Sequence, residues 1–247
     1  MYDRSLRTAT SCASAALALA LLPSAVGAAT IVGGSDLLSS ADASQLETWL
    51  GEGSLTLTNV FDKAPGDDSK SFHVAADGKG ATFSVIEVVG MHGDDPFDKP
   101  ILIGGYNPQS WSKNSGRNVT PLDLDRTAFV FNLTRGLKFD QRKDAGTTDR
   151  GKCQTENARR TGPTFGCGHD LRVDFSLGSG FGRLYSYGSD ADIYLDLALY
   201  PAPQLRDLSL GQIEVFALAP PSIPEPGTWV LMLAGLGLMG FACRRRA

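Results

Sequence analysis

The chain has 247 residues, of which 42% are hydrophobic and 20% are charged, with a formal net charge of −4. Because the charge is moderate and Leu, Ile, Val and Phe are plentiful, the composition excludes a disordered chain. An acidic balance also excludes nucleic acid as an expected partner, and the length suits one domain with a sizeable core.

Residues 1–29 have the features of a secretory signal peptide. Arg4 and Arg7 precede an apolar run over 13–22, and small residues continue to Ala29. The apolar run is too short to span a membrane. We therefore predict export, with a signal peptidase cleaving after Ala28 or Ala29.

Two short helices are predicted at the start of the body. The first is expected to end at residue 50, and the second is expected to stop at Gly78 in the C′ position. The candidate capping residues are Ser40 or Asp42 for the first helix and Asp67 or Asp68 for the second.

Short strands are predicted over most of the remaining body. Leu171, Val173 and Phe175 alternate with charged residues, which is the period of a half-buried strand. Glycine, at 28 residues, supplies many turns. The pattern predicts a mostly β protein, a β-sandwich with a few short helices. The strand-like runs cover residues 55–58, 82–89, 101–104, 128–133, 171–175, 183–187, 193–199 and 213–218.

Three polar segments, 92–100, 110–121 and 135–160, are predicted to be loops. Of all charged residues, 18 basic and 25 acidic ones lie within 30–223, so the body has a net charge of −7. The segment 135–160 departs from this balance, with eight basic residues against four acidic ones. We favour a solvated loop over a contact surface for an anionic polymer.

The body has two cysteines, Cys153 and Cys167. In an exported chain, such a pair most simply forms one disulfide bond. A free pair or a metal site is the alternative, but two cysteines alone do not complete a four-ligand zinc site. The bridge would hold the end of the 135–160 loop on the following strand.

Two short motifs invite functional interpretations that the rest of the chain does not support. Activated trypsin-like proteases begin with a sequence such as that of residues 31–34, but the chain has no Gly-Asp-Ser-Gly stretch for a nucleophile. Gly178, Gly180 and Gly182 lack a following helix that would bind phosphate. A hairpin turn is the expected structure of this glycine segment.

Metal sites are equally poorly supported by the sequence. Two groups of aspartates offer oxygen ligands for calcium, but neither has EF-hand spacing. The three histidines are far apart in the chain, so we predict no metal and no cofactor. The aspartate groups are Asp94, Asp95 and Asp98, and Asp190, Asp192 and Asp196; the histidines are His73, His92 and His169.

Five segments of the body match one family in order and spacing. The segments are residues 79–86, 103–111, 128–133, 162–171 and 213–216. Together they resemble the TLDc domain, and the resemblance covers about residues 46–218. It implies two antiparallel sheets packed as a sandwich with short flanking helices. The family motif residues are Gly104, Gly105, Tyr106, Trp111, Gly162, Pro163, Phe165, Gly166, Gly168, His169, Asp170 and Glu214.

The resemblance implies less about activity. Eukaryotic members are linked to protection against oxidative stress and to binding the vacuolar proton pump, and no catalytic mechanism is established for the domain. His169 and Asp170 are weak catalytic candidates, an acid/base or metal-ligand pair if both face one cleft. We favour the alternative that both fix the glycine-rich turns by hydrogen bonding.

The C-terminal tail has three parts in order: a Pro-Glu-Pro motif, an apolar run and an arginine cluster. The 16-residue run reaches about 24 Å as a transmembrane helix, with the arginines in the cytoplasm. A generic anchor would share this architecture, but the tail resembles the PEP-CTERM sorting signal. That resemblance implies an exosortase that removes the helix and delivers the body to the cell surface or the extracellular polysaccharide matrix. The parts are Pro224, Glu225 and Pro226, then residues 228–243, then Arg244, Arg245 and Arg246.

The sequence therefore divides into a signal peptide (1–29), a TLDc-like domain (30–223) and a sorting and anchor segment (224–247). We expect a non-enzymatic, surface-sorted module that binds or structures the matrix, with extracellular polysaccharide as the candidate ligand. The processing partners are the exosortase and the signal peptidase. The alternatives are an extracellular hydrolase that uses His169 and Asp170 with His73 or Glu214, and a calcium-dependent matrix module.

Overall fold

The computed structural model of the chain describes residues 29–91, 97–143, 149–189 and 207–219. The predicted sorting tail, residues 1–28 of the predicted signal peptide, and the strand predicted over 193–199 lie outside the described residues. Within the part that the structure describes, no helix is long and apolar enough to cross a membrane.

Helix α1 (Ser40–Leu50) begins with a reciprocal cap. The backbone N–H of Asp42 donates to the Ser39 hydroxyl at 3.2 Å, and the backbone N–H of Ser39 donates to the Asp42 carboxylate at 2.9 Å. This arrangement is a capping box, which satisfies two backbone donors of the first turn. The cap is Ser39, one residue before the predicted position.

Helix α2 (Ser69–Ala76) is capped by Asp68, one of the two predicted candidates. The Asp68 carboxylate accepts the backbone N–H groups of Lys70 and Ser71 at 2.8 and 3.3 Å. Gly78 follows the helix with a φ of +73°, the left-handed conformation expected at this position.

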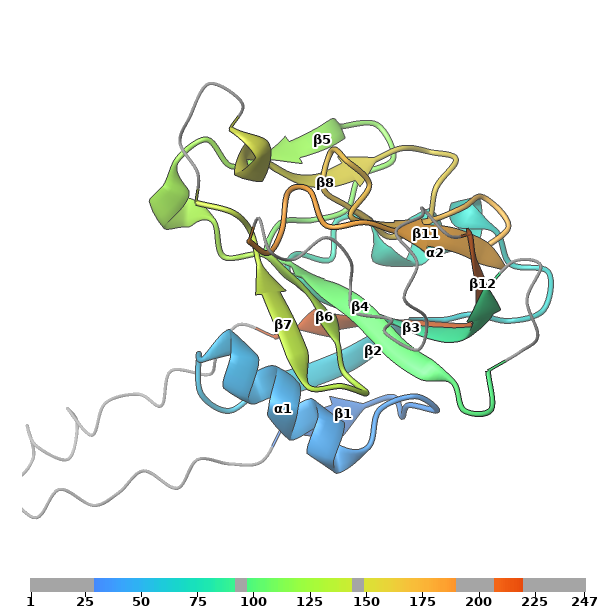
Figure 1. Cartoon of the computed structure of the whole chain (residues 1–247). Helices are drawn as coiled ribbons and strands as arrows, with labels where there is room; N and C mark the ends of the chain where they lie inside the picture. Colours follow the sequence, from blue (N-terminus) through green and yellow to red (C-terminus); the bar gives the residue numbers. More distant parts are fainter. Residues whose placement is uncertain (1–28, 92–96, 144–148, 190–206, 220–247) are drawn as a thin grey trace, which may run out of the picture.

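The first layer of the fold is a sheet that contains the longest strands of the described chain (Figure 1). In spatial order it contains β2 (Thr56–Asp62), β12 (Asp207–Leu218), β3 (Thr82–Met91), β4 (Ile101–Asn107), β6 (Phe129–Asn132) and β7 (Leu137–Asp140). These neighbours pair antiparallel, whereas the short β1 (Thr30–Val32) pairs in parallel with β2.

The second layer contains shorter strands and two 3₁₀ helices. The strands are β11 (Ser179–Gly182), β10 (Leu171–Val173), β9 (Thr164–Phe165), β8 (Cys153–Asn157) and β5 (Gly116–Val119); the 3₁₀ helices are η1 (Asp123–Asp125) and η2 (Arg150–Lys152). The start of β12 pairs with β11 and its end pairs with β2. Register shifts in the β12 and β3 pairing lie between these two parts, and such irregularities bend a strand. One continuous hydrogen-bonded sheet therefore contributes the strands of both layers.

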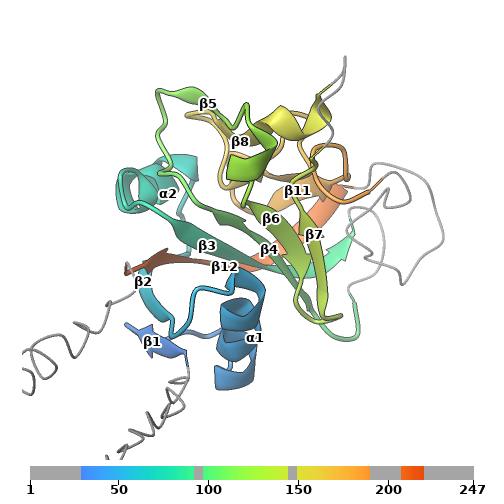
Figure 2. The ribbon, with the colours of Figure 1, turned by 90° about the vertical axis from the view of Figure 1, so that its left-hand side faces the viewer.

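Both faces of the first sheet are covered, as Figure 2 shows, with α1 on one side and β5 and β8 on the other. On β3, Phe83 and Val85 belong to the core against α1, whereas Ile86 and Val88 belong to the core between the layers. This alternation is that of a strand buried on both faces. The predicted mostly β sandwich with short helices is confirmed.

Two adjacent glycines of β4 are required by close contacts, Gly105 with the second layer and Gly104 within the first sheet. A Cβ atom on Gly105 would lie 2.6 Å from the ring of Phe165, which belongs to the second layer. A Cβ atom on Gly104 would lie 2.0 Å from the carbonyl oxygen of Ser84. Phe165 therefore packs directly on β4, edge-on to the buried Trp111 ring at 5.4 Å between centroids.

Two of the three predicted loops contain strands, so the loop prediction was wrong there. Strand β5 lies in 110–121, and β7 and β8 lie in 135–160. The residues of β8 are mostly polar, yet Gln154 and Asn157 are buried, and Asn157 donates to the Asn118 side chain at 3.1 Å. Apolar periodicity does not reveal a strand whose buried side chains hydrogen-bond one another.

The prediction of a strand over 183–187 was also wrong. The strand in this region is β11, which occupies the glycine segment that was expected to be a hairpin turn. A Cβ atom on Gly180 would lie 2.2 Å from the carbonyl oxygen of Arg172 on the neighbouring strand. Glycine is therefore required here by the close approach of two strands rather than by a turn.

The predicted disulfide bond between Cys153 and Cys167 is confirmed. Their Cα atoms are 5.5 Å apart, within the usual range for a bridge. Cys153 begins β8 and Cys167 lies in the turn that follows β9. The bridge therefore connects two parts of the second layer.

Reduction of this bridge is expected to lower the stability of the exported protein. A closed loop of this size stabilises a fold by about 3 kcal/mol in the chain-entropy model, equivalent to roughly 10 °C in a domain of this size. Thermal melting with and without a reductant measures the change, with the variant carrying both Cys153→Ala and Cys167→Ala as a control that a reductant does not affect. Two free thiols in the exported wild-type protein would contradict the prediction.

Candidate functional site

Most of the family motif residues lie in one segment, 162–170, which ends with the buried carboxylate of Asp170. One oxygen of Asp170, Oδ1, accepts three backbone N–H groups, from Tyr185, Ser186 and Tyr187, at 2.5, 2.6 and 3.0 Å. Asp170 has no exposed surface. Burial raises the pKa of its carboxyl from 3.8 to about 6, against the three backbone hydrogen bonds, which lower it. Asp170 therefore holds the 185–187 backbone in place.

The glycines around Asp170 leave room for these contacts. A Cβ atom on Gly166, whose φ is +73°, would lie 1.8 Å from Oδ2 of Asp170. A Cβ atom on Gly168 would lie 2.7 Å from the Cβ atom of Tyr185. Neither position accommodates a side chain without displacing the turn or the residue packed on it.

His169 is directed away from the buried carboxylate. Its backbone has a φ of +55°. Its Nε2 atom lies 3.0 Å from a carboxylate oxygen of Glu156, and its ring lies 5.5 Å from that of Phe181 between centroids. Because His169 contacts Glu156 while Asp170 binds backbone N–H groups, the two residues do not form the acid/base pair that a shared cleft would require.

Tyr187 extends the network into the core. Its hydroxyl donates to the carbonyl oxygen of Gln154 at 2.5 Å, and the side chain is fully buried. Burial raises the pKa of the Tyr187 hydroxyl well above its usual value, and the charge of Asp170 raises it further. This contact joins the 185–187 segment to β8.

His73 lies in a different place from His169. It is buried, with Nδ1 at 2.7 Å from a carboxylate oxygen of Asp77 and Nε2 at 3.0 Å from the carbonyl oxygen of Ala158. It links the end of α2 to the second layer. The hydrolase alternative uses His169 and Asp170 and offers His73 or Glu214 as a further residue. The contacts of His73 place it in a different environment from His169.

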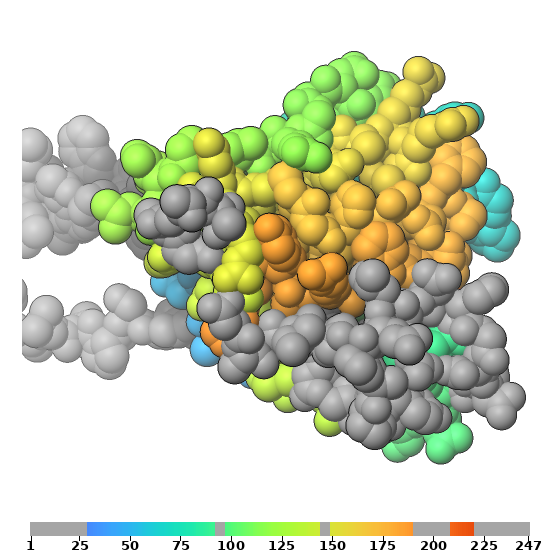
Figure 3. All heavy atoms as spheres, turned by 45° about the horizontal axis from the view of Figure 1, so that its top comes forward, coloured from blue at the N-terminus to red at the C-terminus, as the bar shows by residue number. Residues whose placement is uncertain are grey.

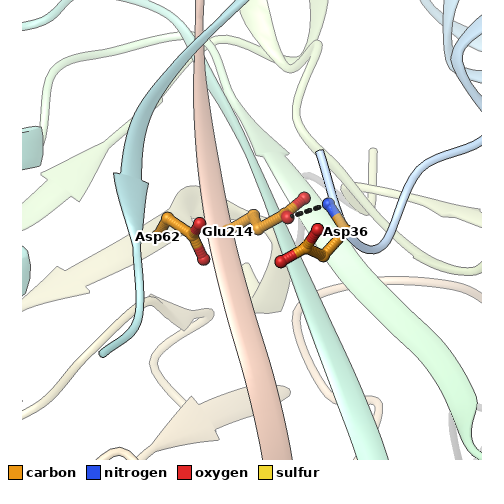
Figure 4. A group of neighbouring side chains, drawn as sticks. All are labelled: Asp36, Asp62 and Glu214. Atoms are coloured by element: carbon orange, nitrogen blue, oxygen red, sulfur yellow. Dashed lines mark hydrogen bonds between the residues drawn. The ribbon is translucent and has the colours of Figure 1, made fainter. Parts of the chain in front are cut away.

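Glu214 on β12 belongs to a third cluster, shown in Figure 4. One carboxylate oxygen accepts the Ser35 hydroxyl at 2.5 Å, and the other accepts the backbone N–H of Asp36 at 2.6 Å. Burial raises the pKa of Glu214, and these two hydrogen bonds lower it. Glu214 thereby fastens the segment before α1 to the central sheet.

Asp36 and Asp62 lie beside Glu214, and one carboxylate oxygen of each of the three lies within 4.8 Å of the others. Such oxygens are ligands of the kind that calcium binds, but calcium takes six to eight of them. The sequence did not predict this cluster. Of the aspartates that the sequence suggested for calcium, all except Asp98 lie outside the described residues.

Two surface hollows are lined by other residues. One, of about 300 Å³, is lined by residues that include Lys79, Tyr106 and Leu218. The other, of about 420 Å³, is lined by residues that include Lys138 and Gln141. Neither hollow contains His73, His169 or Asp170 in its lining, so the catalytic candidates do not open into these two spaces.

The basic residues of 135–160 do not form one patch. Arg142 is buried, and its guanidinium donates to the carbonyl oxygen of Ser189. Lys138 pairs with Asp140 at 2.9 Å. Arg150 lies over the Tyr185 ring instead, at 5.6 Å. The single solvated loop that the sequence predicted is therefore divided among different surroundings.

The fold and these contacts define a β-sandwich domain whose glycine and aspartate motif builds a turn. The chain belongs to the TLDc domain family, whose model matches residues 31–219. A second match, to the PEP-CTERM protein-sorting motif, covers residues 222–246 and marks the chain as a surface protein sorted by an exosortase. A comparison with curated proteins finds no match to this chain.

Sequence reasoning missed several residues that the tertiary structure brings into these clusters. The 185–187 segment lies in the strand-like run 183–187, for which the sequence predicted a strand. The residues missed in this way are Asp36, Asp62, Glu156, Tyr185 and Tyr187.

Proposed function

We propose that the exported chain is a non-enzymatic module that binds the extracellular polysaccharide matrix. The observation that carries the proposal is the sorting motif over 222–246, directly after a disulfide-stabilised sandwich. An exosortase-sorted protein reaches the surface, where polysaccharide is the abundant polymer. The contacts of His169 and Asp170 support a binding role over the hydrolase alternative, because both residues are occupied in holding the turn.

We also propose the course of processing. A signal peptidase cleaves after Ala28 or Ala29, and the helix over 228–243 holds the precursor in the inner membrane. The exosortase then separates the body from that helix. This order follows from an apolar run at each end and from arginines after the second run, which remain in the cytoplasm.

The exported protein is expected to co-sediment with isolated matrix polysaccharide without releasing new reducing ends from it. A binding module holds its ligand unchanged, whereas a glycoside hydrolase creates one reducing end at each cleavage. Co-sedimentation and a reducing-sugar assay on the same sample measure both results. Reducing ends that appear with the wild-type protein and disappear with His169→Asn would establish the hydrolase instead.

A further inference from the structure

Two half-exposed aromatic rings on the second layer are surrounded by arginines. The guanidinium groups of Arg150 and Arg183 lie 5.6 and 6.0 Å from the centre of the Tyr185 ring. The guanidinium of Arg172 lies 5.5 Å from the centre of the Phe181 ring. We call these five residues the aromatic-arginine face.

The two halves of this face are continuous with each other. Tyr185 packs against Gly168, and the next residue, His169, contacts the ring of Phe181. Phe181 and Arg172 are direct neighbours across the β10 and β11 pair. In Figure 3, which looks onto this side, segments 150–160 (yellow) and 165–185 (orange) form adjoining surface.

Contacts beneath the surface hold the aromatic-arginine face in position. Asp170 binds the backbone of residues 185–187, and the lack of a side chain at Gly168 lets Tyr185 lie flat against the turn. The family motif therefore has a second consequence besides stability, which is to position Tyr185 at the surface. Asp170 and Gly168 are positioning residues for the face.

Charge distinguishes this region from the rest of the body. Residues 150–185 contain six lysines and arginines against three acidic residues, one of which is the buried Asp170. The whole body has a net charge of −7. The other two acidic side chains lie beside basic ones, since Asp174 pairs with Arg172 at 3.2 Å, which offsets the charge of that arginine, and Glu156 lies 3.0 Å from His169. The face is locally basic on an acidic protein.

We propose that the aromatic-arginine face binds an anionic polysaccharide whose sugars carry carboxylates. A guanidinium held over a ring has lost much of its freedom, and a guanidinium binds a carboxylate by two parallel hydrogen bonds. The half-exposed rings add apolar contact for the C–H groups of the sugars. This inference rests on the proposed function and names the ligand class and the surface.

A nucleic acid would also suit arginines and aromatic rings. The acidic body disfavours it, because nucleic acids are attracted by extended basic surfaces, with about one charge per 1.7 Å in the DNA duplex and about one per 3.4 Å along each strand. A polymer with one carboxylate per sugar has a lower charge density. The observations therefore favour the polysaccharide, and DNA becomes an outcome of the test.

The test uses exported, processed protein and three probes: polygalacturonate, neutral dextran and single-stranded DNA. Polygalacturonate is expected to bind, and loss of two arginines in the variant Arg172→Gln, Arg183→Gln should weaken it by about tenfold or more. The matched control, Lys79→Gln with Lys99→Gln, removes two exposed positive charges outside the face and should have little effect. Tyr185→Ala should weaken binding, whereas Tyr185→Phe keeps the ring and should retain it. Melting curves identify any variant that is unfolded.

Each contrary result has a distinct meaning. If both double variants weakened polygalacturonate binding equally, binding would depend only on the net charge of the protein. That result would overturn the aromatic-arginine face as the binding site. Binding of polysaccharide that is insensitive to the arginine variant would overturn the face and leave the proposed function standing. Binding of DNA in preference to polygalacturonate would replace the ligand class. Failure of the folded wild-type protein to bind isolated matrix polysaccharide would overturn the proposed function itself.

Discussion

Replacing Asp170 by alanine is expected to destabilise the protein by about 3 to 5 kcal/mol, because three backbone N–H groups lose their acceptor in a buried setting. Asp170→Asn keeps an acceptor oxygen and should cost less. Asp174→Ala is the matched control, since this half-buried carboxylate four residues later contacts Arg172 and Ser179 at the surface, and its loss should cost less than about 1 kcal/mol. Denaturant unfolding of the three variants measures the differences.

The effect of replacing Asp170 on stability is expected to depend on pH, because the Asp170 carboxyl titrates. Its pKa is about 6 in the folded protein and 3.8 as a free group, so the folded state binds more protons between these values. The contribution of Asp170 to the free energy of unfolding is therefore fully present below about pH 4 and is lost as pH rises through about 6, by roughly 3 kcal/mol in total.

Comparison with Asp170→Asn isolates this contribution, because asparagine does not titrate. The stability of the variant relative to the wild type should rise between pH 4 and 7. A small effect of Asp170→Ala at pH 5, or a constant difference between the wild type and Asp170→Asn across this range, would contradict the role assigned to the buried carboxylate.

Replacing Pro224, Glu225 and Pro226 by alanine is expected to leave most of the protein in the membrane fraction instead of at the surface. The exosortase would no longer recognise its motif, and the uncut helix over 228–243 with three terminal arginines would hold the body at the membrane. Immunoblots of membrane and extracellular fractions measure the distribution.

A control for this experiment is available just upstream. Pro220→Ala with Pro221→Ala changes two prolines that precede the sorting-motif match, which begins at residue 222. This variant should be sorted as the wild type is. Normal release of the protein that lacks the Pro-Glu-Pro motif would show that the tail is a generic anchor, and that residues 224–226 do not direct processing.

Local sequence determined the parts of this protein that depend on neighbouring residues. The cap of α1 lies within one turn, at Ser39, one residue before the predicted Ser40. Asp68, a predicted candidate, caps α2 by accepting the backbone N–H groups of Lys70 and Ser71. The central strands followed from apolar runs, because both of their faces are buried. The C-terminal sorting motif was also predicted from local sequence, since the Pro-Glu-Pro motif, apolar run and arginines follow one another directly.

The tertiary structure decided the arrangements that join residues far apart in the chain. Asp170 finds its donors 15 to 17 residues later, and Glu214 binds Ser35 across 179 positions. The polar strand β8 and the glycine strand β11 form because partner strands lie on both sides of them, and no local pattern contains those partners. The sequence alone thus determined destination, fold class and the two possible partners of one disulfide. Only the tertiary structure assigned the roles of His169 and Asp170. A hydrogen bond depends on where the partner lies in space, and the periodicity of apolar residues in the sequence does not contain that information.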